Sequence, residues 1–167
     1  GNVTAGLAFG GNPSSASTEE WTGAGAPIGV WSTGGNLNQD RYGMSASGTV
    51  TASIAFGGRI SPPNAFSALN EQYDGTSWTE VNDLNTGRGF MGSTTGPYTA
   101  VLGMGGNVPP ATTKVESWNG TNWTEITALN SAKSNVAGCG TTTAALVTGG
   151  SGGGNTNEIW NGSNWTE

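Results

Sequence analysis

The feature that most constrains this chain is an eight-residue stretch that recurs along it. Residues 118–125 read Trp-Asn-Gly-Thr-Asn-Trp-Thr-Glu, and residues 73–80 and 160–167 repeat this sequence with few changes. The central Asn-Gly or Asp-Gly supplies the positive φ angles of a tight hairpin turn, and an aromatic residue stands on each side. Trp21 and Trp31 flank a longer, degenerate copy. Each copy therefore predicts one β-hairpin.

Other markers keep the same period. A Gly-Gly pair follows an apolar run at intervals of 47, 48 and 44 residues, beginning at Gly10, Gly57, Gly105 and Gly149. The second hairpin tryptophan recurs at intervals of 47, 45 and 42 residues, at Trp31, Trp78, Trp123 and Trp165. A Leu-Asn pair precedes a basic residue at Leu37-Asn38 with Arg41, Leu84-Asn85 with Arg88, and Leu129-Asn130 with Lys133. The chain is therefore an internal repeat.

One repeat, followed from Arg88, predicts four short strands. Residues 90–95 contain small residues and few charges, and residues 98–104 are nearly all apolar. Residues 114–118 alternate between polar and apolar side chains, and residues 122–126 complete the hairpin. Gly-Pro, Gly-Gly and Asn-Gly separate these runs as turns do. Four antiparallel strands in under 50 residues form one blade of a β-propeller.

The order of these markers resembles the kelch repeat of β-propellers, the architecture also found in the central domain of galactose oxidase. The resemblance covers essentially the whole chain and implies an all-β, kelch-type β-propeller. Two sequence motifs also resemble the Gly/Thr/Asn-rich kelch-like repeats of bacteriophage virion and tail-fibre proteins: Trp-Asn-Gly-Thr-Asn-Trp-Thr-Glu and Leu-Asn-Ser-Ala-Lys. That likeness implies a virion or extracellular location.

The repeats predict one domain, 1–167, with about four blades at residues 1–38, 41–85, 88–130 and 133–167. The first blade is incomplete, because residues 3–37 supply only the last three strands. This leaves three readings: a four-bladed ring with an open seam, chains that share blades, or an excerpt of a longer repetitive protein. An unpaired innermost edge would leave backbone groups without partners. We therefore expect other copies of the chain, further chain or neighbouring subunits to fill it.

Composition argues against several functions. The chain has no histidine, one cysteine and only 10% charged residues, so it lacks the commonest general base and transition-metal ligand. We expect no enzyme activity, no cofactor and no metal, and we expect Cys139 to be a buried packing residue. A net charge of −6 without a basic cluster argues against nucleic acid as a partner. The absence of an apolar run of about 20 residues argues against membrane insertion.

The recurring residues predict structural contacts. Trp31, Trp78, Trp123 and Trp165 should occupy one equivalent position and pack between adjacent blades. Arg41 and Arg88 should be buried and hydrogen-bonded. The predicted partners of Arg41, Arg88 and Lys133 are recurring glutamates of the same or a neighbouring blade. Two series recur: Glu80, Glu125 and Glu167, and the residues just before the third-strand aromatic, Glu20, Glu71, Glu116 and Glu158.

Recognition is expected at the loops that join the second and third strands, because they vary in length on a repeated scaffold. These loops comprise residues 12–17, 59–68, 107–113 and 151–155. The candidate binding residues are Arg59, Phe66, Asn107 and Asn155, together with Arg41, Arg88 and Lys133 beside them. The first hypothesis is a recognition module that binds a cell-surface glycan or protein receptor. The alternative is a structural building block of a virion or fibre with no small ligand.

Overall fold

The computed structural model describes residues 4–23, 30–152 and 156–167, and within these ranges it contains strands and no helix. Accordingly, no helix suited to crossing a bilayer occurs in the described part of the chain. The strands form four successive antiparallel sheets and one small hairpin. The predicted all-β fold is thereby confirmed.

Each of the four main sheets follows chain order from one edge to the other. The first sheet contains β1 (Ala5–Phe9), β2 (Thr18–Thr22) and β3 (Val30–Thr33). The second contains β4 (Ser45–Thr49), β5 (Ala52–Phe56), β8 (Asn70–Tyr73) and β9 (Trp78–Val81). The third contains β10 (Gly92–Ser93), β11 (Val101–Met104), β12 (Val115–Trp118) and β13 (Trp123–Ile126). The fourth contains β14 (Ala137–Gly140), β15 (Ala145–Thr148), β16 (Glu158–Trp160) and β17 (Trp165–Thr166).

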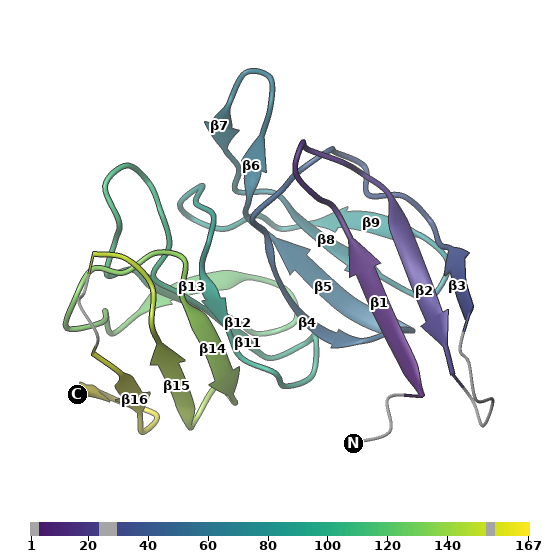
Figure 1. The fold of residues 1–167 in the computed structure, drawn as a ribbon. Helices are drawn as coiled ribbons and strands as arrows, with labels where there is room; N and C mark the ends of the chain where they lie inside the picture. The colour runs from purple at the N-terminus through teal and green to yellow at the C-terminus, as the bar shows by residue number, and fades with distance from the viewer. Residues whose placement is uncertain (1–3, 24–29, 153–155) are drawn as a thin grey trace.

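These sheets stand side by side in an arc, with the first and the fourth at opposite ends (Figure 1). The first sheet has three strands and the other three have four, as the repeat count predicted. An additional hairpin, β6 (Arg59–Ile60) and β7 (Ala65–Phe66), rises from the second sheet in Figure 1. The sequence had indicated only a loop there.

The recurring eight-residue stretch forms the predicted hairpin in the last three sheets. Only the glycine of each Asn-Gly or Asp-Gly pair, such as Gly120 with φ +94°, has a positive φ angle, whereas the sequence had predicted it for the pair. Its two aromatic residues lie directly opposite each other, as Trp118 and Trp123 do with ring centroids 5.4 Å apart. In the turn, Asn119 Oδ1 accepts hydrogen bonds from the backbone N–H groups of Thr121 and Asn122, both at 2.9 Å. An Asn or Asp side chain thus holds the turn while the aromatic pair stabilises the strands.

The Gly-Gly pairs end the second strands at places where a side chain has no room. Gly57 has φ +66°, and a Cβ atom there would lie 2.3 Å from the Arg88 carbonyl oxygen. The amide of the following residue, Gly58, donates to that same carbonyl at 2.9 Å. This close backbone approach ties the second sheet to the connection that leads into the third.

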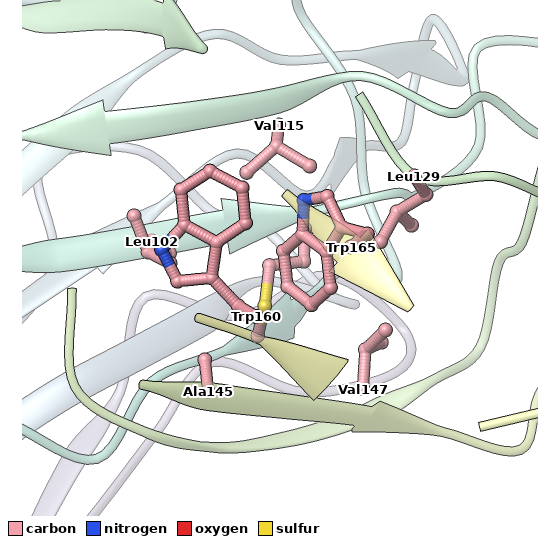
Figure 2. Packing of buried hydrophobic residues seen from close by; sticks show 8 residues of the cluster. Leu102, Val115, Leu129, Ala145, Val147, Trp160 and Trp165 are labelled. Carbon is pink, nitrogen blue, oxygen red and sulfur yellow. The ribbon is translucent and has the colours of Figure 1, made fainter. Parts of the chain in front are cut away.

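The hydrophobic core consists of layers between successive sheets. Between the third and fourth sheets, Trp160 and Trp165 extend from the fourth sheet toward Leu102 and Val115 of the third (Figure 2). Equivalent clusters join the first to the second sheet and the second to the third. Each sheet thus covers one face of its predecessor. The first and the fourth sheets each have one face that no other described sheet covers.

Two sequence predictions need correction at this level. Tyr98 was expected to begin a strand, but Ala100 N–H donates to Pro97 O at 2.9 Å in a turn, and β11 begins at Val101. Cys139 was expected to be buried, but it is exposed. It pairs with Leu146 across β14 and β15, on the face of the fourth sheet that no other described sheet covers.

Candidate functional site

The recurring basic residues form buried ion pairs with glutamates of the same sheet. Arg41 Nη2 lies 2.5 Å from Glu71 Oε1, and Arg88 Nη2 lies 3.1 Å from Glu116 Oε1. In the fourth sheet, Lys133 Nζ lies 3.3 Å from Glu158 Oε1. All three cations are fully buried. The prediction that Arg41 and Arg88 are buried is confirmed.

The same burial corrects the proposal that Arg41, Arg88 and Lys133 contact a ligand. Arg41 also donates to the carbonyl oxygens of Gly57 and Leu69, both at 2.8 Å. Burial lowers the pKa of the Arg41 guanidinium, because the loss of hydration outweighs the attraction of Glu71. The side chains of these three cations therefore bind acceptors inside the protein, and they link each sheet to the segment that leads into it.

The asparagine of each Leu-Asn pair completes this arrangement. Asn85 donates to Glu116 Oε2 through both its backbone N–H and its side-chain amide, each at 2.8 Å. Its side chain also donates to Trp123 O at 3.0 Å. The other two copies repeat these bonds, with Asn38 on Glu71 and Trp78 O, and Asn130 on Glu158 and Trp165 O. We call this four-part group the Asn-cation-Glu-Trp cluster.

Three of the four recurring tryptophans pack between sheets as predicted. Trp78 lies 4.8 Å from Phe9 of the first sheet, and Trp123 lies 4.8 Å from Phe56 of the second, between ring centroids. Trp165 belongs to the core cluster shown in Figure 2. Trp31 is different: it is 50% exposed. Trp31 does occupy the equivalent position by register, opposite Trp21. The prediction that it packs between sheets is wrong, because no described sheet lies against that face of the first sheet.

The predicted glutamate series also needs one change. Glu19, and not Glu20, is the equivalent of Glu71, since Glu19 pairs with Ala8 as Glu71 pairs with Ala55. Glu20 instead accepts a hydrogen bond from the Tyr73 hydroxyl across the first two sheets. Burial and this glutamate raise the pKa of Tyr73.

Two of the predicted loop residues come together on the β6–β7 hairpin. Arg59 and Phe66 pair across the two strands, and the Arg59 guanidinium carbon lies 5.0 Å from the centre of the Phe66 ring. Phe66 also lies edge-on to Phe90, with centroids 6.5 Å apart, and Phe90 lies edge-on to Tyr42 at 6.1 Å. We call these four residues the Arg59 aromatic cluster.

Backbone contacts fix the positions of residues in the Arg59 aromatic cluster. The backbones of Tyr42 and Arg59 exchange two hydrogen bonds, at 2.7 and 3.0 Å. Phe90 has φ +58°, which turns it out of the strand in which the sequence had placed it. All four side chains are half-buried, and Arg59 Nε has no hydrogen-bond partner in the described structure. Sequence reasoning missed Tyr42 and Phe90, although each follows a recurring arginine within two residues.

Among the described residues, Asn107 makes no side-chain contact with this cluster. Asn107 exchanges backbone hydrogen bonds with Gly89 at 2.8 and 3.3 Å, and its buried side-chain oxygen has no hydrogen-bond partner among the described residues. Asn155 lies outside the described residues. These bonds do show that the loops lie beside the connections between sheets, as expected.

The described residues contain no group of three or more His, Cys, Asp or Glu side chains arranged to hold a metal ion. A cavity of about 320 Å³ lies away from the loops, between β1 and β4. Its lining includes Gly6, Leu7 and Ser47.

Comparison with known proteins gives a likeness of fold. No protein-family model matches the chain, and no curated protein matches it. Among solved structures, it is similar to one titled "Structure of YjhT", with a TM-score of 0.67 and 13% sequence identity. The match covers 86% of this chain and 49% of that one. The chain thus spans about half the length of that structure, and at this identity the likeness concerns the arrangement of sheets only.

Proposed function

We propose that this chain is part of a kelch-type β-propeller that acts as a non-enzymatic recognition module. Its four sheets are the blades, and the loop side is the binding side. The ligand is a cell-surface glycan or protein receptor, and the setting is a virion tail fibre or another extracellular appendage. The kelch-like order of the repeated motifs supports the propeller fold. The Gly/Thr/Asn-rich composition of the repeats supports the location in a virion or extracellular appendage.

The observation that carries this proposal is the Arg59 aromatic cluster. Aromatic rings and arginine combine a large contact area with few rotatable bonds, and they dominate the binding energy of many interfaces. Here the Arg59 guanidinium lies over the Phe66 ring, and both half-buried side chains are held on a protruding hairpin. Ring faces stack against the apolar side of a sugar or against a receptor side chain, and a guanidinium donates to hydroxyl or carboxylate oxygens.

A binding screen tests the proposal. The chain would be applied to an array of cell-surface glycans and to intact candidate host cells, alongside Phe66→Ala and Arg59→Lys variants. We expect Phe66→Ala to abolish binding, because it removes the ring on which Arg59 rests. Arg59→Lys should weaken it, since lysine keeps the charge but loses the planar fork.

Lys114→Ala is the matched control, because it removes a partly exposed cation on the third sheet and should bind like the parent chain. Equal binding by all three variants would contradict the placement of the site. Absence of binding to every glycan and cell surface would favour the alternative function.

That alternative is a structural building block of a virion or fibre. A separate observation favours it: the end sheets carry exposed apolar side chains, with Trp31 at 50% and Ile159 at 55% exposure. Such surfaces mark contacts with other subunits. Light scattering distinguishes the two functions, since a building block should form larger assemblies as its concentration rises.

A further inference from the structure

Two hollows meet between the second and third sheets, at the end of the strands away from the β6–β7 hairpin. One has a volume of about 240 Å³ and the other about 500 Å³, and Ala52 and Tyr98 line both of them. Ala52 is the first residue of β5, whereas the loop that carries β6 and β7 follows the last residue, Phe56. The hollows therefore lie a strand length from the Arg59 aromatic cluster. We call them together the Tyr98 cleft.

The tyrosine at this cleft is an exception in the repeat. Tyr98 stands seven residues before the Gly-Gly pair of its own repeat, and the residues at that position in the second and fourth sheets are Val50 and Thr142. Its half-buried side chain packs in part against the core cluster between the second and third sheets. Its hydroxyl has no hydrogen-bond partner among the described residues. The repeat therefore does not require an aromatic ring at this turn.

Polar side chains of the second sheet line the smaller of the two hollows. Gln72 and Thr79 pair across β8 and β9, and Asp74 follows β8 in the hairpin turn. Asp74 Oδ1 accepts hydrogen bonds from the backbone N–H groups of Thr76 and Ser77, both at 2.8 Å. In the described structure, Asp74 Oδ2 accepts a single bond, from the Ser77 hydroxyl at 3.4 Å. Because a carboxylate has about four lone-pair sites, Oδ2 can accept a further hydrogen bond.

The charge of the Tyr98 cleft narrows the class of ligand. Asp74 is the one charged side chain among the described residues that line the two hollows. An anionic ligand would meet this carboxylate without a cation to balance it. Because Asp74 is exposed, water and salt screen its attraction for a lone cation. Neutral hydroxyl groups fit better, since they donate to Asp74 and accept from the Gln72 amide.

We propose that the Tyr98 cleft binds a neutral pyranose sugar, at a site that the function proposed above does not include. The Tyr98 ring packs against the apolar C–H side of the sugar, and Asp74 and Gln72 bind its hydroxyl groups. The larger hollow, between the turns at residues 48–49 and 95–97, accommodates a second sugar unit. Its volume falls within the range of about 300 to 1,000 Å³ that is typical of ligand sites.

Saturation-transfer NMR with the full chain tests this proposal. The probes are methyl β-D-glucopyranoside, methyl β-D-galactopyranoside and N-acetylglucosamine, and sorbitol is the acyclic control. We expect saturation transfer to at least one of the three pyranoses and none to sorbitol. Backbone amide shifts should be confined to residues 48–52, 72–79 and 95–98. Binding of only glucosamine or only glucuronate, tested in parallel, would overturn the assignment of a neutral ligand.

Variants at the turns test the roles of the side chains. Tyr98→Val should fold, because valine occupies the equivalent position in the second sheet, and it should weaken sugar binding at least about tenfold through loss of the ring. Asp74→Asn matches Asn119 of the next turn and should weaken binding about fivefold, because an amide replaces the charged acceptor. Thr142→Ala, at the equivalent position in the fourth sheet, is the matched control and should bind like the parent chain.

Unchanged affinity of Tyr98→Val would overturn the proposal, as would absence of saturation transfer to all three pyranoses at tens of millimolar probe. Amide shifts at residues 59–66 instead would assign the sugar to the Arg59 aromatic cluster and would also overturn it. Phe66→Ala separates the two sites, because it should leave binding at the Tyr98 cleft unchanged. Failure of the recognition role proposed for the β6–β7 hairpin is therefore distinguishable from failure of this inference.

Discussion

Replacing Glu116 by glutamine tests whether the buried ion pairs hold the sheets together. Both charged side chains of the Arg88–Glu116 pair are fully buried. Glutamine keeps the size of the side chain but removes its charge, so Arg88 would remain ionised without a counter-ion. Its lowered pKa, caused mainly by burial, shows that the environment already disfavours the cation. Removing one partner of a buried pair typically costs about 3 to 5 kcal/mol.

The hydrogen bonds of Glu116 add to this cost. Its second oxygen accepts two bonds from Asn85, and an amide –NH₂ placed on either side would face a donor. We expect Glu116→Gln to lower the free energy of unfolding by about 3 to 5 kcal/mol. At about 2 to 4 °C per kcal/mol for a chain of this size, the melting temperature should fall by about 6 to 20 °C. Urea unfolding followed by tryptophan fluorescence and calorimetry would measure both quantities.

Glu125→Gln is the matched control. Glu125 pairs with Lys114 at 2.6 Å, but the two side chains are 52% and 36% exposed, so this change should cost about 1 kcal/mol or less. The double variant Arg88→Met/Glu116→Leu should recover part of the loss, because it removes both buried charges. Equal, small effects of Glu116→Gln and Glu125→Gln would refute the structural role assigned to the cluster.

Other predictions concern packing, backbone and pH. Trp123→Ala should cost about 3 to 5 kcal/mol of stability, because the side chain is 6% exposed and stacks near Phe56, whereas Trp31→Ala should have a much smaller effect; similar losses in urea unfolding would contradict the difference. Gly57→Ala should cost at least about 1 to 3 kcal/mol, because it forces a left-handed φ and meets the Arg88 carbonyl, while Gly96→Ala, with its nearest atom at 3.5 Å, should be tolerated; equal melting temperatures would refute this. Backbone N–H groups of Ser77 and Thr76 hold the pKa of Asp74 below its ordinary value, so its contribution to stability is present above the unfolded pKa and is lost as pH falls through the folded pKa. An NMR titration should find that lowered pKa, and Asp74→Asn, which matches Asn119 of the next turn, should remove this pH dependence; an ordinary Asp74 pKa would contradict the turn geometry.

Much of the fold could be predicted from sequence because its elements are local and repeated. Asn119-Gly120 sets a hairpin through turn chemistry that needs no distant partner, and the Gly-Gly pairs mark strand ends in every repeat. The burial of Arg88 also followed, since an isolated cation that recurs in a low-charge chain needs a recurring acid. Strand ends were less predictable: apolar character extends to Tyr98, but backbone pairing begins at Val101.

The candidate site was only partly accessible to such reasoning. Arg59 and Phe66 could be selected from a variable loop, but Tyr42 and Phe90 come from two other segments and meet them only because neighbouring sheets bring their loops together. Repetition also made Trp31 look equivalent to Trp123, and Cys139 look like a packing residue. Their exposure depends on which sheet faces have a neighbour. The sequence by itself determined the hairpins, the sheets and the burial of the recurring arginines, because those features repeat in every unit. The tertiary structure decided which glutamates pair with the cations and which sheet faces remain exposed, because both depend on how strands and neighbouring sheets are placed.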